Sequence, residues 1–429
     1  MKHNLANTLI AITLCILSAM SSAQVISGSA WFGILQPPGI GDPHSPSVDV
    51  QSANSPPARV PSGEEDFAAL EGEQLFQYVD EIVGFSRQSR AEGNRVWGRV
   101  TGFPSAERTI RWAADQFRDA GLVNVAVQEY PASADMWWAD DWEVRLLADS
   151  AFGDNSRDVI LETSLPTGES HIEGSSFTAP LVLVGHISEP IPNVDVQGKI
   201  AVQRLTPLTG AYSERTPTRE RAQQLIARGA VAVINVVEQT GNMHTRDFSN
   251  CNGPCFNLGT TDGEFLIAVM QRAQSAGLSE RLRIQLTLDA GMRSSLSGHN
   301  AMAMVDGDNG RDGEIVIVNA HADGWYDAAG DNADGLAVLI GMARHFAQPE
   351  NRPARNIVFV ASGGHHSRGL NGPANFVRMN PSILERTVLV LNLEHIAQFE
   401  IHSQDWSVGP NEQPMNFSIT NAAPFLTEL

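Results

Sequence analysis

Three apolar runs in the second half of the chain predict buried β-strands. They cover residues 315–319, 357–361 and 388–393, and each is rich in branched aliphatic side chains. Continuous apolar runs of this length are typical of parallel strands that are buried on both faces. Between the first two runs, apolar residues recur at helical spacing over 335–346. The order strand, helix, strand therefore predicts an α/β core.

A second helix is expected upstream, at 105–120. Ser105 is placed to cap its N-terminus, and Gly121 is placed to end it. Its apolar face would carry Ile110, Ala113, Ala114 and Phe117. We interpret this segment as a helix that packs on the core.

The middle of the chain has a different character and predicts a small inserted domain. Short β-type runs at 181–184, 199–202 and 231–237 are separated by turns. We therefore expect a β-rich insertion at 178–288, which divides a larger domain into a first part at 64–177 and a second part at 289–429.

The N-terminus predicts export. Lys2 is followed by an apolar stretch at 9–20 and by small residues up to Ala23, which is the layout of a signal peptide at 1–23. The alternative is an uncleaved membrane anchor, because no charged residue lies between Lys2 and Asp42. Residues 24–63 are predicted to be a linker rich in proline and serine. The expected location is periplasmic or secreted.

Composition excludes several classes of partner. With 29 Lys and Arg against 49 Asp and Glu, the formal charge is −20, which opposes binding to nucleic acid or anionic lipid. The mean hydropathy of −0.15 argues against a polytopic membrane protein. Of three cysteines, Cys15 would leave with the signal peptide, and Cys251 and Cys255 flank an Asn-Gly-Pro turn. A disulfide is favoured in an oxidising compartment, and a redox or metal pair is the alternative.

Groups that bind metals follow each of the three predicted core strands. Because ligands bind at the carboxyl ends of strands in open α/β sheets, these groups are expected to meet at one edge. They are His321 and Asp323 after the first strand, His365 and His366 after the second, Glu394 and His395 after the third, and Asp331 at the start of the intervening helix.

Histidine nitrogen and carboxylate oxygen are ligands that suit zinc, and a catalytic zinc keeps a position open for water. The sequence thus predicts one or two zinc ions, with Asp331 shared if there are two, and hydrolysis of an amide or ester. Each residue also has a structural explanation. Asp331 could cap the helix, the histidines could be buried core residues or polar turn residues, and Asp323 could be a turn residue. Glu394 is harder to explain in this way, because a carboxylate after an apolar strand is costly to bury without a partner.

Several segments resemble the zinc-dependent exopeptidases of the aminopeptidase and glutamate carboxypeptidase type. They are VNAHADGWYDAAGDNADGLAVLIGMARHF, RNIVFVASGGHHSRGLNGPANF and VLVLNLEHIA, with GRVTGFPSAERTIRWAADQFRDAGLVNVAVQEYP upstream. The resemblance covers about 65–397. It implies a doubly wound α/β fold with a mixed, mostly parallel sheet. VDVQGKIAVQRL and ARGAVAVINVV resemble the protease-associated domain that is inserted in this family.

The resemblance also implies roles for single residues. His321 would bind one metal ion, and Asp323 would orient the His321 side chain. Asp331 would bridge two metal ions, and Glu394 stands where the family has an aspartate ligand. The family's adjacent glutamates, a general base and a ligand, are replaced by His365 and His366, or by His366 and Ser367 if the alignment has no gap. We expect His365 to act as the base and His366 to contribute to a second metal position.

A last family ligand, a histidine downstream, has no counterpart before Leu429. Either the chain is truncated at its C-terminus or the second metal position is incomplete. The predicted function is an exported metallo-exopeptidase, either an aminopeptidase or a carboxypeptidase, that acts on short peptides. The alternatives are a peptide-binding protein that has lost catalysis and an amidohydrolase or esterase that acts on non-peptide substrates.

Overall fold

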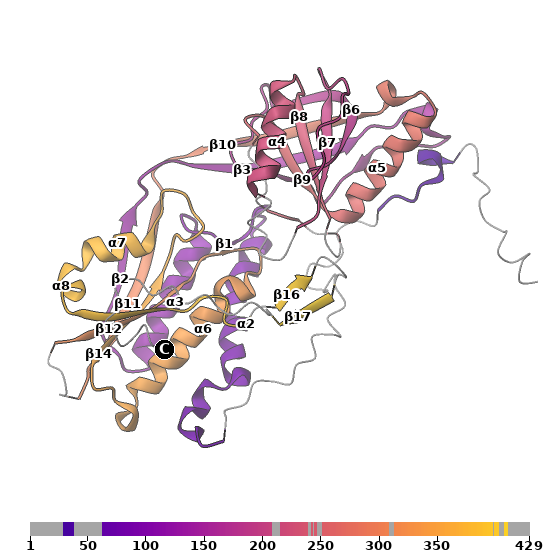
Figure 1. Cartoon of the computed structure of the whole chain (residues 1–429). Helices are drawn as coiled ribbons and strands as arrows, with labels where there is room; N and C mark the ends of the chain where they lie inside the picture. The colour runs from indigo at the N-terminus through magenta and orange to yellow at the C-terminus, as the bar shows by residue number, and fades with distance from the viewer. Residues whose placement is uncertain are drawn as a thin grey trace, which may run out of the picture. The chain divides into compact units, whose positions relative to one another are not determined.

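The computed structural model describes residues 29–37, 62–207, 215–238, 242, 244–246, 251–308, 313–397, 399–402 and 407–410. The chain forms two compact units, one from Met1–Ser47 with Trp142–Leu288 and the other from Val48–Asp141 with Asp289–Leu429 (Figure 1). The predicted signal peptide and most of the predicted linker lie outside the described residues. Within the described part, no helix has the length and apolar character needed to cross a membrane.

The larger unit, Val48–Asp141 with Asp289–Leu429, holds most of the α-helices. Its helices are η3 (Glu65–Leu70), α2 (Gly72–Ala91), α3 (Pro104–Asp119), η7 (Ala329–Ala333), α6 (Asp334–Ala347), η8 (Pro349–Asn351), α7 (Gly372–Met379) and α8 (Pro381–Leu384). Its strands are β1 (Gly98–Arg99), β2 (Val123–Pro131), β11 (Ser297–Val305), β12 (Ile315–His321), β13 (Gly324–Trp325), β14 (Asn356–Ser362), β15 (Thr387–Asn392), β16 (Phe399–His402) and β17 (Ser407–Pro410). Strands β3 (Met136–Leu146) and β10 (Arg283–Arg293) carry the chain into and out of the other unit.

A five-stranded mixed sheet in the order β15-β12-β14-β11-β2 forms the centre of this unit. Strands β15, β12 and β14 are parallel, whereas β11 runs antiparallel to both of its neighbours, β14 and β2. The three predicted core strands are thus adjacent and parallel. In the register, His321 lies opposite Ser362 and Asn319 opposite Asn392, so the three strands end at the same edge.

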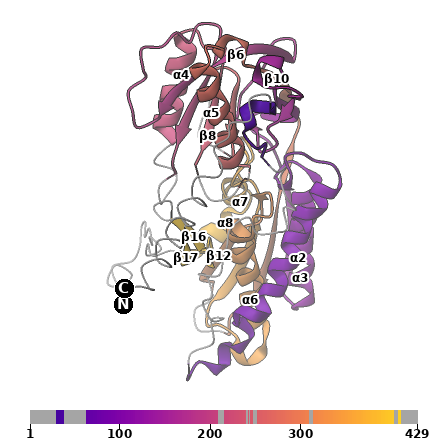
Figure 2. The ribbon, with the colours of Figure 1, turned by 90° about the vertical axis from the view of Figure 1, so that its right-hand side faces the viewer.

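Helices cover both faces of this sheet, which confirms the predicted doubly wound α/β fold (Figures 1 and 2). On one face, α2, α3 and α6 bury residues such as Ile110, Phe117 and Leu336 against alternate residues of β11, β12 and β14. On the other face, Phe376 of α7 packs with residues such as Ile317 and Val360. The helical spacing predicted at 335–346 is realised by α6, whose apolar face is fully buried.

The start of α3 differs from the prediction. The helix begins at Pro104 with Phe103 as the N-cap residue, so Ser105 lies inside the first turn and does not cap it. The Ser105 hydroxyl donates instead to the carbonyl oxygen of Gly98 at 2.6 Å. The reason is that a proline fits the first helical position, where its missing N–H is not needed. The predicted apolar face is buried, and the helix ends before Gly121, which has a φ of +84°.

The burial predicted for the third core strand is wrong. Strand β15 is the edge strand of the sheet in the described part of the chain, and Val388 and Val390 are 50% and 56% exposed. An apolar run identifies a strand, but the number of faces that are covered depends on which elements pack beside it.

The longer segment of the smaller unit covers Trp142–Leu288, so it starts upstream of the predicted insertion boundary at 178. Its helices are η1 (Ala30–Gly33), η4 (Ser150–Phe152), α4 (Arg215–Ala227), α5 (Thr260–Ser275) and η6 (Ser279–Arg281). Its strands are β4 (Val159–Ile160), β5 (Leu165–Pro166), β6 (Ser176–His186), β7 (Ile200–Leu205), β8 (Ala232–Val237) and β9 (Cys255–Leu258). They belong to an eight-stranded sheet in the order β4-β3-β10-β6-β7-β8-β9-β5, in which β6 to β9 are parallel.

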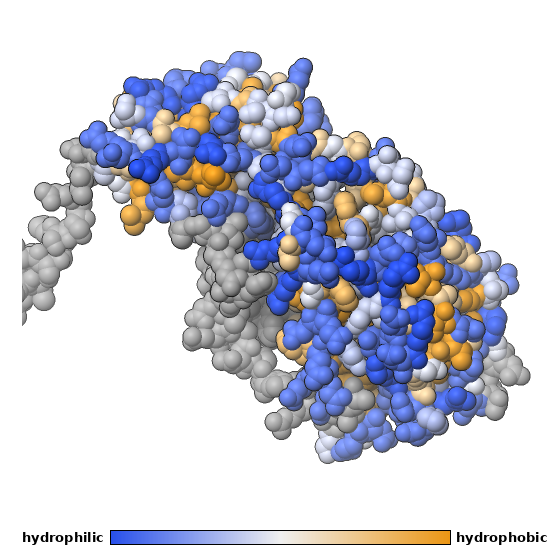
Figure 3. Space-filling view, turned by 180° about the vertical axis from the view of Figure 1, so that it is seen from behind, coloured by the Kyte–Doolittle hydropathy of each residue, from blue (hydrophilic) through white to orange (hydrophobic). Residues whose placement is uncertain are grey.

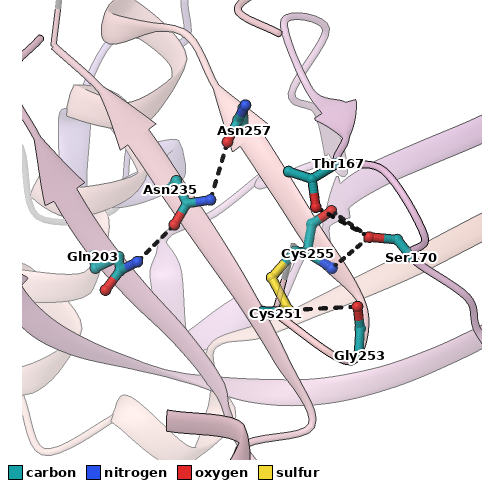
Figure 4. The surroundings of a disulfide bond; sticks show 8 residues. All are labelled: Thr167, Ser170, Gln203, Asn235, Cys251, Gly253, Cys255 and Asn257. Carbon is teal, nitrogen blue, oxygen red and sulfur yellow. Dashed lines mark hydrogen bonds between the residues drawn. A yellow bond between two sulfur atoms is a disulfide. The ribbon is translucent and has the colours of Figure 1, made fainter. Parts of the chain in front are cut away.

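Several buried polar groups in this unit hydrogen-bond to one another (Figure 4). A row of amides crosses three strands: Gln203 donates to Asn235 at 2.7 Å, and Asn235 donates to Asn257 at 3.0 Å. Cys251 and Cys255 are joined by a disulfide in a buried loop. The Ser170 hydroxyl donates to the backbone oxygen of Cys255 and accepts its N–H, both at 3.1 Å. These contacts hold the loop on the edge of β9.

Part of the segment that the sequence places in the linker is packed in the smaller unit. Trp31 is fully buried, with its ring 5.6 Å from that of Phe152 and 6.2 Å from that of Phe265. Its indole nitrogen donates to the carbonyl oxygen of Arg157 at 3.1 Å. Trp31 thus anchors residues 30–33 in the smaller unit.

One face of the molecule is mostly polar. The face in Figure 3 is largely hydrophilic, with hydrophobic side chains gathered in separate small patches.

Candidate metal centre

The ligand-type residues predicted from the sequence lie together in the larger unit. One ligand atom from each of His321, Asp331 and Glu394 falls within 4.8 Å of the other two. A second group of the same kind consists of His321, His365 and His366. Both groups contain His321, the last residue of β12. They lie next to each other because the parallel strands end at one edge of the sheet.

Asp331 connects two of the histidines. Its Oδ1 atom lies 3.2 Å from Nε2 of His321 and 3.0 Å from Nε2 of His366. The side chain does not cap α6, which has Ala333 at its N-cap position. The capping role considered for Asp331 is therefore not realised.

Glu394 follows β15 and faces the same histidine from the other side. Its Oε1 atom lies 3.6 Å from Nε2 of His321 and 3.5 Å from Nε2 of both His365 and His395. Its second oxygen accepts a hydrogen bond from Asn392 at 3.0 Å. The glutamate is therefore oriented toward the histidines by a neighbour on its own strand.

Asp323 supports the centre from behind. It is 1% exposed, and its two carboxylate oxygens accept the backbone N–H groups of His365 at 3.1 Å and His366 at 2.9 Å. Nδ1 of His321 donates to the backbone carbonyl oxygen of Asp323 at 3.1 Å and lies 3.4 Å from its Oδ1 atom. Asp323 thus orients the His321 ring through its backbone and positions, through its carboxylate, the turn that carries the other two histidines.

Both His365 and His366 lie beside His321, whereas Ser367 makes its hydrogen bond outside the cluster. His365 and His366 both place their rings beside His321, with centroids 4.4 and 5.2 Å away. The Ser367 hydroxyl is buried and donates to the carbonyl oxygen of Thr101 at 3.2 Å. Of the two alignments, only the one with a gap pairs both glutamates with residues of the cluster.

Arg99, a residue that the sequence analysis did not single out, holds the loop between Asp323 and Asp331. Its side chain is fully buried. The guanidinium donates to the carbonyl oxygens of Ala322 at 2.9 Å, Asp327 at 2.9 Å and Ala328 at 3.0 Å. The only sequence signal is a single arginine in the motif GRVTG, and its target carbonyls are visible only in the folded chain.

Close backbone packing places Arg99 over this loop. Gly98 pairs with Trp325 and Arg99 with Gly324 in the short ladder of β1 and β13. A Cβ atom on Gly98 would lie 2.5 Å from the carbonyl oxygen of Gly324. Gly98 also has a φ of +135°, which L-residues with side chains rarely adopt. Glycine is therefore required at this position.

The carboxylates and imidazoles of the centre shift one another's pKa values. Burial lowers the pKa of His321, but its contacts with Asp323, Asp331 and Glu394 outweigh burial and raise the pKa to about 11. Contact with His321 lowers the pKa of Glu394 to about 2. Burial raises the pKa of Asp331, but its contacts with His321 and His366 hold that pKa well below its ordinary value. A protonated His321 therefore balances the two carboxylates when no cation is bound.

A pocket of about 330 Å³ opens beside the centre. His321, His365 and Glu394 form one wall. The remaining lining is mainly apolar and includes Ile317, Val360, Phe376, Val377, Leu384 and Val390. An apolar side chain placed there would lie next to the ligand cluster.

The donor set fits zinc. His321 is 3% exposed, and its Nε2 atom makes no hydrogen bond to any described residue although it lies between two carboxylates. Tetrahedral zinc with bonds of about 2.0–2.1 Å holds its ligand atoms about 3.4 Å apart. The separations from this nitrogen to Asp331 and Glu394, 3.2 and 3.6 Å, are close to that value.

Two solved peptidase structures are similar to this chain in fold. The zinc aminopeptidase of Bacillus subtilis superposes with a TM-score of 0.50 at 22% identity, over 74% of this chain and 69% of that one. The peptidase M28 precursor of Shewanella amazonensis gives 0.54 at 19% identity, over 77% and 74%. At these identities the likeness concerns the fold.

Residues 300–422 match the sequence profile of peptidase family M28. This match spans β11, β12, α6, β14 and β15, and therefore all of the metal-centre residues described above. The resemblance to zinc-dependent exopeptidases is thereby confirmed. No curated protein shows significant sequence similarity to the chain.

Proposed function

We propose that this chain is a zinc-dependent exopeptidase that hydrolyses a terminal bond of short peptides. The observation that carries the proposal is the buried Nε2 atom of His321, which has no hydrogen bond and lies 3.2 Å from Asp331 and 3.6 Å from Glu394. A histidine nitrogen with two carboxylates beside it is a ligand set that suits a zinc ion.

In this proposal, His321, Asp331 and Glu394 hold the better-defined zinc ion. His366, which contacts Asp331 from the other side, contributes to a second position if a second ion binds. A zinc ion at this centre would polarise a peptide carbonyl and lower the pKa of a water molecule toward about 7. Asp323 keeps the histidines oriented, as partners of metal-binding histidines commonly do.

His365 is the proposed proton acceptor. Its side chain is 48% exposed and lines the pocket, so it faces the space that a substrate would occupy. Burial, together with the neighbouring His321 and His366, lowers the pKa of His365. The ring is therefore neutral near pH 7 and able to accept a proton.

The pocket supports a small substrate. A volume of about 330 Å³ is at the lower end of the range for small-molecule sites, about 300–1,000 Å³. Its apolar lining favours a terminal residue with an apolar side chain. We further propose that the protein is exported and that the smaller unit includes a protease-associated domain, as the sequence motifs at 194–205 and 227–237 imply.

A non-catalytic peptide-binding protein is the second candidate. It is favoured by the replacement of two carboxylates by His365 and His366, which leaves Asp331 and Glu394 as the carboxylates that face the ligand position in the described residues. Fewer negative charges hold a second cation less tightly.

Metal analysis combined with a peptide digest tests the proposal. We expect purified full-length protein to contain zinc and to release terminal residues from short peptides, with activity lost on chelation and restored by zinc. The aminopeptidase and carboxypeptidase alternatives are separated by blocking one peptide terminus at a time. Protein that binds peptides without cleaving them would support the second candidate. Cleavage of esters or non-peptide amides alone would indicate the amidohydrolase or esterase activity.

A further inference from the structure

Three histidines form a ligand set that contains only nitrogen donors. One ring nitrogen from each of His321, His365 and His366 lies within 4.8 Å of the other two. The ring centroids of His365 and His366 are 4.7 Å apart, and both rings flank His321. Nitrogens that share one ion at about 2.0 Å lie about 3–4 Å apart. Modest side-chain rotations therefore suffice to bring the three rings onto a common ion.

These three histidines share one support and open to solvent at one end. Asp323 accepts the backbone N–H groups of His365 and His366 and faces Nδ1 of His321. The exposed fraction of the side chain rises from 4% in His321 to 19% in His366 and 48% in His365. An ion from solution would therefore meet His365 first and His321 last.

The nitrogen set and the carboxylate-containing set cannot be used at the same time. His321 belongs to both, and its Nδ1 atom faces Asp323, so Nε2 is the atom available to an ion. One imidazole lone pair binds one ion. A cation on the three histidines thus excludes a cation from the position formed by His321, Asp331 and Glu394.

The two sets favour different cations. Imidazole nitrogen suits Cu²⁺, which binds a given site most tightly among the divalent first-row metals, whereas zinc also accepts carboxylate ligands readily. Neutral imidazoles contribute no negative charge, so a cation there is stabilised by nitrogen donation more than by charge pairing. Copper gains more than zinc from such a set.

We propose that His321, His365 and His366 form a nitrogen-only copper site that competes with the zinc position and inactivates the protein when it is filled. The inference rests on the proposed function in one respect, because Cu²⁺ bound to His365 removes the proposed proton acceptor. The ligand set itself does not depend on the reaction.

Electron paramagnetic resonance of the full-length protein tests the site. The protein is freed of metal with a chelator and given one equivalent of Cu²⁺. We expect a signal with coupling to three imidazole nitrogens. His365→Ala and His366→Ala should each lose one nitrogen, and copper affinity should fall at least about tenfold. His395→Ala is the matched control, because its ring contacts Glu394 at 3.5 Å but lies outside the set. Its spectrum should equal that of the wild type.

Competition with zinc gives a second readout. Copper added to the zinc-loaded protein should release zinc and stop hydrolysis, and chelation followed by fresh zinc should restore both. The proposal is overturned if copper and zinc bind together, or if the copper spectrum is unchanged when both His365 and His366 are replaced. A protein that binds copper through three nitrogens but never cleaves peptides would reject the proposed function and leave the copper site standing.

Discussion

The Oδ1 atom of Asp331 lies 3.2 Å from Nε2 of His321, between the end of β12 and the start of α6. Replacing Asp331 with Asn removes the negative charge and keeps the size of the side chain. Loss of an outer partner alone weakens metal binding by about 10–100-fold, so loss of this ligand should weaken zinc affinity by more than about 100-fold. Competition with a chromophoric chelator measures the change.

Asp327→Asn is the control for this substitution, because Asp327 lies on the same loop but pairs with the exposed Arg87. Its zinc affinity should stay within about twofold of the wild type, since exposed ion pairs contribute little. Unchanged zinc affinity in Asp331→Asn, accompanied only by a lower melting temperature, would show that the residue is merely structural.

Arg99 should matter for metal binding although it touches no ligand atom. Arg99→Met removes three hydrogen bonds to the carbonyls of the loop that leads to Asp331. It also removes a buried positive charge beside Asp323 and Asp331. We expect zinc affinity to fall by about 10–100-fold, measured on protein that circular dichroism shows to be folded.

Arg87→Met is the matched control, since Arg87 binds the exposed carboxylate of Asp327 on the same loop. Arg99→Lys keeps the charge but has fewer donors, so its zinc affinity should fall between those of the wild type and Arg99→Met. Wild-type zinc affinity in both Arg99 variants would exclude a positioning role.

His365→Ala should separate turnover from zinc binding. The side chain lies outside the set formed by His321, Asp331 and Glu394, so zinc content should be retained. Loss of a general base typically slows the reaction by about 10²–10⁴-fold, and kcat should fall in that range. Exposed His171, in the smaller unit, is the control position. Full activity of His365→Ala would remove His365 from the mechanism.

Zinc and protons should compete for His321. In the cation-free protein its pKa of about 11 exceeds the ordinary value of 6.5, so its ion pairs stabilise the fold fully below pH 6.5 and are lost as pH rises toward 11. Zinc needs the unprotonated nitrogen, so zinc affinity should rise with pH and zinc binding should release protons. Calorimetry in buffers of different ionisation enthalpy measures the proton release. A zinc affinity that is constant between pH 6 and 9 contradicts this assignment.

The acid side of the stability profile has a separate origin. Contact with His321 lowers the pKa of Glu394 from 4.5 to about 2. The contribution of Glu394 to the free energy of unfolding is therefore complete above pH 4.5 and is lost as pH falls toward 2. For these two groups, the cation-free protein should therefore be most stable between about pH 4.5 and 6.5. Thermal melts with chelator present, from pH 3 to 9, measure this profile, and Glu394→Gln should flatten its acid side.

Much of the larger unit could be predicted because its signals are local. The apolar runs at 315–319 and 357–361 and the helical spacing at 335–346 correspond to β12, β14 and α6. The residues of each run favour, by their own type and spacing, the strand or helix that the fold requires at that place. Tertiary packing therefore reinforces the local preference. The position of His321, Asp323 and Glu394 after these strands followed from the same reasoning.

Other features depend on neighbours that are distant in the chain. Serine is a residue type that commonly caps helices, yet α3 begins at Pro104, and the Ser105 hydroxyl donates to the carbonyl oxygen of Gly98. Val390 belongs to an apolar run, yet it is 56% exposed because β15 lies at the edge of the sheet. Trp31 stands in the segment predicted to be a linker, yet it is buried beside Phe152 and Phe265.

The order of apolar and polar residues by itself determined the parallel strands of the core and the ligand-type residues at their ends. Only the tertiary structure decided how these residues face one another. It placed Asp331 between two histidines, brought both His365 and His366 to the centre through the backbone bonds to Asp323, and set Arg99 against the loop from 322 to 328. The physical reason is that the periodicity of a strand or helix is a local property, whereas contacts between different elements, up to 229 residues apart for Arg99, depend on the packing of the whole unit.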